Sequence, residues 1–386
     1  MFDTIFIHAG LPKTGSTHIQ DGMQFLSRSG FLKHVAYPIV SSEIGSGNGS
    51  RTADMLLNED SHKVIHTRLD VLVGDLLKAN DGTARNLLLS SEQFFFATAG
   101  GFACLKEVLL RYSRAVKLIV CVRPLREWSY SVYMQMVKAH GIFSDYDEKW
   151  LDEFGSLYLG VFRNFDKFEI DTITFRYQET GLFQLFLHLI GEDEGLVERF
   201  PEAKVNRSLT GTELDTIRKI NSIFQDETLS RAISSRFIRE WPELDSAIFP
   251  SDCEAQFQRF ASRFARDLEP LRGRVMTGLK QILFADIHAP PGSSLDKCAD
   301  DQRDLMDVAL REIRQLQDRY MRDGQLYTWL KQYAAGMRPT NDSFDPIHYL
   351  LMYPDLSVPG VDPDVHYRNH GRTEGRASAL AMRHVK

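Results

Sequence analysis

The chain has few cysteines, no long apolar run and no excess of positive charge, and each lack excludes a class of protein. Its four cysteines lie far apart, with no CxxC and no Cys/His pair at zinc spacing, which excludes a disulfide framework and a zinc ribbon. No segment approaches the roughly 20 apolar residues that span a bilayer. Lys and Arg number 46 against 52 Asp and Glu, a net charge of −6, which argues against a general nucleic-acid binder.

The amino terminus also lacks a targeting signal. MFDTIFIHAG has no basic residues ahead of its apolar stretch, which stops after a few residues, unlike a signal peptide. Cys121 lies inside the apolar run VKLIVCV, where a buried small thiol is expected rather than a disulfide. These features predict a cytoplasmic protein without a transmembrane segment. One pocket for a small anion remains compatible with the acidic total.

The composition that is present is that of a globular protein with a large core. Hydrophobic residues make up 43% and charged residues 25% of 386 residues, which suggests two or three domains, or one domain with insertions. Short β-branched or apolar runs precede loops and helical patterns in the first half, at residues 4–8, 86–90, 117–122 and 171–177. Such alternation predicts an α/β fold with a parallel sheet covered by helices on both faces.

The second half of the sequence has the apolar spacing of helices instead. From about 210 to 335 the apolar spacing is helical throughout, and RPTNDSFDP at 338–346 is the best linker candidate. We therefore predict an α/β core at 1–210, a helical extension completing it at 211–337, and a short carboxy-terminal module at 338–386. The charged side of the late helices is expected to be a solvated face. Histidines of the module have irregular spacing, so no metal site is predicted.

A glycine-containing loop between the first strand and helix has the features of an anion site. Residues 10–17 read GLPKTGST, and its backbone N–H groups, the helix dipole and the hydroxyls of Ser16 and Thr17 can all serve an anion. An ATP- or GTP-binding P-loop has lysine directly after the second glycine, where this chain has Ser16, while its lysine stands at position 13. The loop therefore fits an ordinary ATP site poorly. A glycine turn with an incidental lysine is the alternative.

A second candidate anion site lies about 110 residues further on. Arg123 directly follows the strand at 117–122, at the sheet edge where open α/β folds bind ligands. Ser131 lies eight residues beyond it on the predicted next helix. Arginine binds a phosphate through two parallel hydrogen bonds, and a serine hydroxyl can share that group. The pair is weak alone but becomes specific together with the loop.

These two segments resemble the PAPS-dependent sulfotransferases, where PAPS is 3′-phosphoadenosine 5′-phosphosulfate. PKTGST at 12–17 is similar to their 5′-phosphosulfate loop, and the order Arg123, Ser131, Tyr133, Gln135 is similar to the 3′-phosphate element of heparan sulfate N- and 3-O-sulfotransferases. The resemblance covers roughly residues 4–210. A proline directly after the arginine and the lack of a membrane anchor depart from that pattern and suggest a bacterial-type relative.

The resemblance implies a P-loop-like α/β fold and metal-free sulfuryl transfer from PAPS, which leaves adenosine 3′,5′-bisphosphate. The implied 5′-phosphosulfate site comprises Pro12, Lys13, Thr14, Gly15, Ser16 and Thr17. Arg123 and Ser131 are expected to hold the 3′-phosphate. By its place in the loop, Lys13 is expected to neutralise charge on the bridging oxygen as the bisphosphate leaves. No metal ligand set is predicted.

The acceptor hydroxyl or amine needs a base, and several side chains compete for that role. Glu92 is the first choice because SSEQFF follows the second strand and so reaches the same sheet edge as Lys13, much as the heparan sulfotransferases place a glutamate. The alternative for it is a capping or solvent-facing carboxylate. His18, just past the loop, is the rival, since cytosolic sulfotransferases use a histidine. His140 follows, with a helix-end charge partner as its alternative, and His8 is expected to be structural.

Later segments refine the hypothesis. Lys204 and Asn206 lie in a stretch that resembles the asparagine-serine loop of bacterial members, and either is expected to close over the nucleotide. Arg176 and Tyr177 are interpreted as structural, with a contact to the cofactor as the alternative. The tail, with YPDL and GRTEGR, is similar to modules at the ends of bacterial glycan-modifying enzymes, which favours a saccharide or glycolipid acceptor. The sequence does not specify O- or N-sulfation or the oligomeric state.

Two other functions are weighed against sulfuryl transfer. A nucleotide kinase with a divergent P-loop would need a lysine after Gly15 and carboxylates for Mg²⁺. A non-catalytic module that only binds adenosine bisphosphate would not need the intact set of Lys13, Glu92 and Arg123. The predicted function is therefore a PAPS-dependent sulfotransferase.

Overall fold

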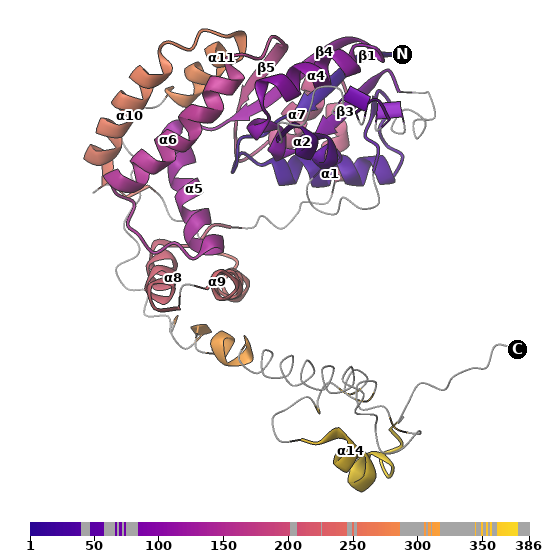
Figure 1. Cartoon of the computed structure of the whole chain (residues 1–386), viewed down its shortest axis with the longest axis vertical. Helices are drawn as coiled ribbons and strands as arrows, with labels where there is room; N and C mark the ends of the chain where they lie inside the picture. Colours follow the sequence, from indigo (N-terminus) through magenta and orange to yellow (C-terminus); the bar gives the residue numbers. More distant parts are fainter. Residues whose placement is uncertain are drawn as a thin grey trace, which may run out of the picture.

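The computed structural model of the chain shows how these segments assemble. The structure describes residues 1–39, 47–57, 66–67, 69–71, 73–74, 84–200, 207–224, 226–244, 249–250, 253–285, 305, 308–309, 311–316, 344, 349, 353, 356 and 361–376. The predicted α/β class is confirmed, because a parallel sheet flanked by helices forms the first half and helices follow it (Figure 1). The predicted domain boundaries stay a prediction.

Five parallel strands form the sheet. Its order is β2-β3-β1-β4-β5, which places β1 at the centre. The strands are β1 (Phe2–His8), β2 (Val35–Ala36), β3 (Asn86–Ser90), β4 (Ser113–Val122) and β5 (Asp171–Arg176). Four of them match the predicted apolar runs, although β4 begins four residues before the predicted start. The two-residue β2 was missed, because so short a strand leaves no periodic pattern.

Helices bury both faces of the sheet, as its apolar strands predict. One face packs Phe6, Leu88 and Ile119 against α1 (Ser16–Arg28), α7 (Leu182–Ile190) and the 3₁₀ turn η2 (Glu194–Arg199). The other face, which carries Ile5, Ile7 and Leu118, packs on the remaining helices of the domain. Cys121 is fully buried between strands and helices, and burial raises the pKa of its thiol to about 12.

The second face is covered in two groups. Near the sheet lie α2 (Ser50–Leu57), η1 (Glu92–Phe96), α4 (Ala99–Leu109) and α5 (Leu125–His140). Beside β5 and farther along α5 lie α6 (Glu148–Phe165), α8 (Gly211–Phe224), α9 (Glu227–Glu240), α10 (Glu254–Leu268) and α11 (Arg274–Leu283). Figure 1 shows α6 and α10 side by side, and α8 and α9 against the carboxy-terminal end of α5. Buried side chains of α8, α9, α10 and α11 belong to the same core cluster as this face of the sheet.

A single buried carboxylate holds the edge strand β2. Glu192, just after α7, accepts backbone hydrogen bonds at Oε1 from Lys33 N (3.0 Å), His34 N (2.6 Å) and Val35 N (2.7 Å). Its side chain is buried. These bonds pair the buried N–H of Val35, which begins β2, and the N–H groups of the two exposed residues before it. The position of β2 therefore depends on a residue more than 150 positions away in the chain.

The described part of the tail contains its own small apolar cluster. Phe344, Tyr349 and Leu356 are buried together, next to α14 (Pro363–His366) and the π-helical turn η6 (Tyr367–Gly371). Tyr349 Oη lies 3.2 Å from His366 Nδ1. The predicted linker at 338–346 lies almost wholly outside the described residues. Among the helices of the described ranges, none is long and apolar enough to cross a membrane.

Candidate functional site

The strand order brings three loops together at one edge of the sheet. Because β1 lies between β3 and β4, the loop after β1 lies between the loops that follow those strands. In a parallel sheet these carboxyl ends share one edge, and ligands bind where the strand order reverses. Lys13, Glu92 and Arg123 each lie in the segment that follows one of these strands. Residues separated by up to 110 positions thereby form one site.

The loop after β1 needs glycine at two positions. Gly15 has φ +79° and stands at the N-cap of α1, where a Cβ would lie 2.4 Å from Leu182 Cδ2. A Cβ on Gly10 would lie 1.8 Å from Ser16 Oγ. Gly10 lets the loop close tightly on the helix, and Gly15 supplies a left-handed turn. Lys13 also has a left-handed conformation, with φ +65°.

Donors at the start of α1 are left free for an anion. Within the described part of the chain, no side chain caps this end of the helix, and its first turn holds no acidic residue. The Ser16 hydroxyl is buried and has no hydrogen-bond partner among the described residues. Thr14 is committed, because its Oγ1 donates to Leu11 O at 2.6 Å, whereas Thr17 is exposed. A buried unpaired hydroxyl beside uncapped N–H groups fits the terminal oxygens of a phosphate or sulfate group.

Lys13 and Glu92 face each other across this loop. Burial lowers the pKa of Lys13, the Glu92 carboxylate opposes that shift, and Arg123 adds to it. The ammonium reaches solvent yet is crowded by protein, and its Nζ donates to Gln135 Oε1 at 3.3 Å. Burial raises the pKa of Glu92, while Ser16 and Lys13 oppose the rise. The Ser16 hydroxyl thus lies close to the Glu92 carboxylate, although outside hydrogen-bonding geometry.

Arg123 and Ser131 are brought together as predicted. Arg123 Nη1 lies 3.4 Å from both Ser131 Oγ and Lys13 O, and its Nε donates to Glu127 Oε2 at 3.2 Å. The guanidinium stacks over the Tyr177 ring, 4.7 Å from the ring centre. Tyr177 was interpreted as structural, and this contact makes it the support of the arginine. The Arg123 side chain is only 18% exposed, so a bound anion would be held in a partly desolvated place.

The histidines lie away from this pair. His18 packs against the rings of Phe183 (5.9 Å) and Phe200 (5.5 Å), and burial lowers its pKa against an opposing effect of Asp21. His140 lies at the carboxy-terminal end of α5, 3.9 Å from Glu227. That end is nine residues past Ser131, or about 13 Å along the helix axis. The charge of Glu92 acts on Lys13, whereas the contacts of His18 and His140 are with these other residues.

His8 has the structural environment expected of it. It is fully buried in β1, and its Nδ1 lies 2.8 Å from Ser90 Oγ. Burial lowers its pKa to about 4, so the ring is neutral near pH 7. Tyr133, which belongs to the family-like element, also has a packing role. Its ring lies in an aromatic cluster and its hydroxyl donates to Ser144 O at 2.8 Å.

Two predicted cofactor residues, Lys204 and Asn206, lie outside the described residues. The next position, Arg207, is described and buried. It donates to both carboxylate oxygens of Glu213, at 2.7 and 2.9 Å, and to the backbone carbonyls of Phe237 and Trp241. This ion pair anchors the start of the helical extension to α8 and α9.

Two residues of α5 escaped the sequence interpretation. The Trp128 indole donates to Pro12 O at 2.9 Å. Lys138 stands seven residues after Ser131 and three after Gln135, on the same helix face. Burial lowers its pKa, and Lys13 and Arg207 lower it further. Heptad spacing from Ser131 could have identified Lys138, whereas no local pattern identifies the direction of an indole N–H.

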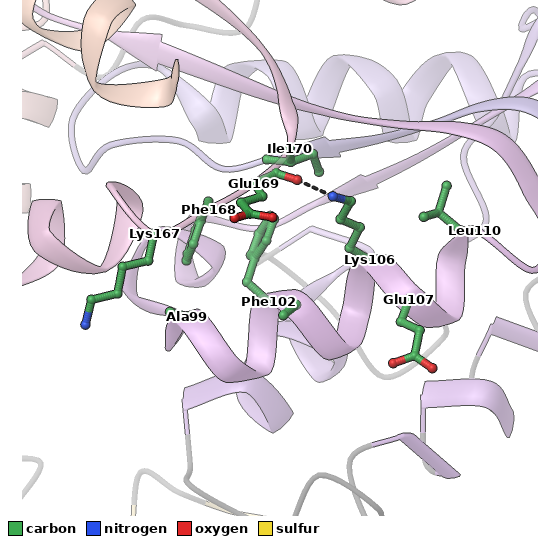
Figure 2. A pocket seen from close by; sticks show the side chains of 10 residues that line it. Ala99, Phe102, Lys106, Glu107, Leu110, Lys167, Phe168, Glu169 and Ile170 are labelled. Carbon is green, nitrogen blue, oxygen red and sulfur yellow. Dashed lines mark hydrogen bonds between the residues drawn. The ribbon is translucent and has the colours of Figure 1, made fainter. Parts of the chain in front are cut away.

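A separate hollow lies at the other end of β5. It is enclosed by α4 and by residues 167–170, which precede that strand, and has a volume of about 300 Å³. Figure 2 shows stacked rings of Phe102 and Phe168 inside it, with Lys106 donating to the Glu169 carbonyl. It does not include Lys13 or Arg123. In the described part of the chain, no group of three or more His, Cys, Asp or Glu side chains is placed to hold a metal ion.

Comparison with known proteins adds no family assignment. No protein-family model matches the chain, and no curated protein matches it at a significant level. The function must therefore be argued from the geometry of the site and from the motif resemblance.

Proposed function

We propose that this protein is a PAPS-dependent sulfotransferase. One observation carries the proposal. Two candidate anion-binding elements and a carboxylate lie together at the carboxyl ends of the central strands of the sheet. The uncapped loop at α1 and the Arg123–Ser131 pair flank Lys13, and Glu92 faces that lysine. Two separate anion sites suit a nucleotide with phosphates at both its 3′ and 5′ positions.

The residues present fit the donor molecule. The unpaired Ser16 hydroxyl and the N–H groups of the α1 start would hold the 5′-phosphosulfate, and Arg123 with Ser131 would hold the 3′-phosphate. When bound, PAPS supplies the sulfuryl group and leaves as adenosine 3′,5′-bisphosphate. Lys13 would stabilise negative charge on the leaving side of the reacting centre.

Glu92 would act as the base for the acceptor. A general base works best when its pKa lies near the working pH, and burial moves the pKa of Glu92 upward, toward that range. Its carboxylate would take the proton of the attacking hydroxyl or amine as the new bond to sulfur forms. The acceptor is proposed to be a saccharide or glycolipid, which rests on the resemblance of the tail alone.

The nucleotide-kinase alternative is less well supported. A kinase P-loop has its lysine after the second glycine, and here Ser16 stands there with Lys13 inside the turn. A non-catalytic nucleotide-binding module would use the same two anion sites. It would give no role to the carboxylate of Glu92 beside Lys13.

Calorimetry with adenosine 3′,5′-bisphosphate tests the proposal. We expect binding in the presence of EDTA, because the proposed contacts come from protein donors only. Binding that requires Mg²⁺ would favour the kinase. Incubation with labelled PAPS and a panel of oligosaccharides, glycolipids and phenols then tests turnover, and bisphosphate binding with no transfer to any class would favour the non-catalytic module.

A further inference from the structure

The loop after β1 has three successive carbonyl groups engaged by side chains. Leu11 O accepts from Thr14 Oγ1 at 2.6 Å, Pro12 O accepts from the Trp128 indole at 2.9 Å, and Lys13 O accepts from Arg123 at 3.4 Å. The last two donors come from neighbouring positions, Arg123 directly after β4 and Trp128 in the first turn of α5. The backbone on either side of Lys13 is therefore held from one direction.

Holding these carbonyls fixes the opposite side of the peptides. In a trans peptide the C=O and N–H groups point in opposite directions. With Pro12 O turned toward Trp128, the N–H of Lys13 faces away from that indole. In the next peptide Lys13 O is turned toward Arg123, so the N–H of Thr14 faces away from that guanidinium. Lys13 and Gly15 both have positive φ, of 65° and 79°. Alternating backbone of this kind makes a concave row of N–H donors that binds anions.

Lys13 does not adopt this conformation without help. A left-handed residue other than glycine is strained, at a cost of about 1–2 kcal/mol. Trp128 is well suited to hold it, because its side chain is fully buried and packs against Phe154 and Tyr158, 5.0 and 4.5 Å between ring centres. Its bond to the loop is shorter than that of Arg123, and the uncharged indole does not bind the ligand phosphate.

We infer that Trp128 is a positioning residue for the anion loop. Its indole N–H orients the Pro12–Lys13 peptide so that the Lys13 N–H and side chain face the 5′-phosphosulfate. The inference rests on the proposed function for the identity of the ligand. It predicts a selective effect, since Trp128 acts only on the 5′ half of the site, while Arg123 and Ser131 bind the 3′ half.

Two nucleotides separate that effect from general damage. Trp128→Phe keeps an aromatic ring but removes the donor, and Trp150→Phe is the matched control, a buried tryptophan of α6 that packs on Phe154 (5.3 Å between ring centres). We expect Trp128→Phe to weaken adenosine 3′,5′-bisphosphate binding roughly tenfold, as for one lost hydrogen bond to a buried carbonyl. Binding of adenosine 3′-phosphate, which lacks the 5′ group, should change less than twofold. The control should leave the ratio of the two affinities unchanged.

Loss of ring volume at position 128 could unfold the protein, so a second variant is needed. β-(3-Benzothienyl)alanine at this position keeps the shape of the indole and replaces only the N–H by sulfur, and it should show the same selective loss. Equal weakening of both nucleotides, or no weakening by the sulfur analogue, would overturn the inference while leaving the sulfotransferase proposal intact.

Inorganic pyrophosphate provides a probe of the loop that needs no nucleoside. If the parent protein binds pyrophosphate but not the bisphosphate, the sulfotransferase proposal fails. In that case, weaker pyrophosphate binding by the sulfur analogue would support the Trp128 inference, and unchanged binding would overturn it. Binding of neither ligand by the parent protein would overturn both proposals.

Discussion

Replacing Glu92 by glutamine separates nucleotide binding from chemistry. The change keeps the size of the side chain and its ability to accept hydrogen bonds, but the amide does not take up a proton. The charge of Glu92 also raises the pKa of Lys13, so its loss lowers that pKa further. Removing a negative charge from an anion site does not weaken nucleotide binding, and adenosine 3′,5′-bisphosphate affinity should stay within a few-fold of the parent.

The expected loss of turnover is large. A positioned general base contributes roughly 10²–10⁴ in rate, and turnover of Glu92→Gln should fall by that factor. The dependence of the rate on pH provides an independent test. Because burial raises the pKa of Glu92, the parent rate should increase with pH through a limb above the ordinary carboxyl range, and the variant should lose that limb. Because burial lowers the pKa of Lys13, the rate should fall at high pH earlier than for an ordinary lysine.

The assay is release of adenosine 3′,5′-bisphosphate from PAPS with the best acceptor of the panel, followed by chromatography. Glu107→Gln makes the same chemical change on the outer face of α4 and should leave turnover unchanged. Lys13→Ala should differ from both by lowering affinity and turnover together. Turnover of Glu92→Gln within threefold of the parent, with the acidic limb retained, would refute the role of Glu92 as base. His18→Ala and then His140→Ala would be the next variants.

Two further predictions follow from single contacts. Arg123→Ala should weaken bisphosphate binding by about 2–4 kcal/mol, since a partly buried charged contact is lost, while Arg114→Ala, an exposed arginine at the other end of β4, should have no effect in the same calorimetry. Unchanged affinity would remove Arg123 from the site. Glu192→Ala should lower the free energy of unfolding by about 3–5 kcal/mol in urea titrations, because three backbone N–H groups lose a charged acceptor and the Val35 N–H is left buried. The exposed Glu198→Ala is its control, and a loss below about 1 kcal/mol would show that water replaces the carboxylate.

Much of the fold could be predicted because its signals are local. The apolar runs of β1, β3, β4 and β5 and the glycine loop ahead of α1 appear directly in the sequence. Runs of that kind followed by helices have few arrangements other than a parallel sheet. Two features of the structure could not be predicted in this way. β2 depends on Glu192, and the support of Arg123 depends on Tyr177, both of which are distant in sequence from what they hold.

The residue types of the candidate site could also be predicted from the sequence, namely lysine within the loop, arginine after β4 and glutamate after β3. Their meeting was decided by the strand order, because only a central β1 places its loop between those that follow β3 and β4. The direction of individual side chains belongs to the tertiary structure as well. His18 follows the loop directly but turns toward Phe183 and Phe200, whereas Trp128 reaches back to Pro12. Helical and strand periodicity record which face of an element is apolar, but a hydrogen bond between distant segments depends on packing that no local pattern contains.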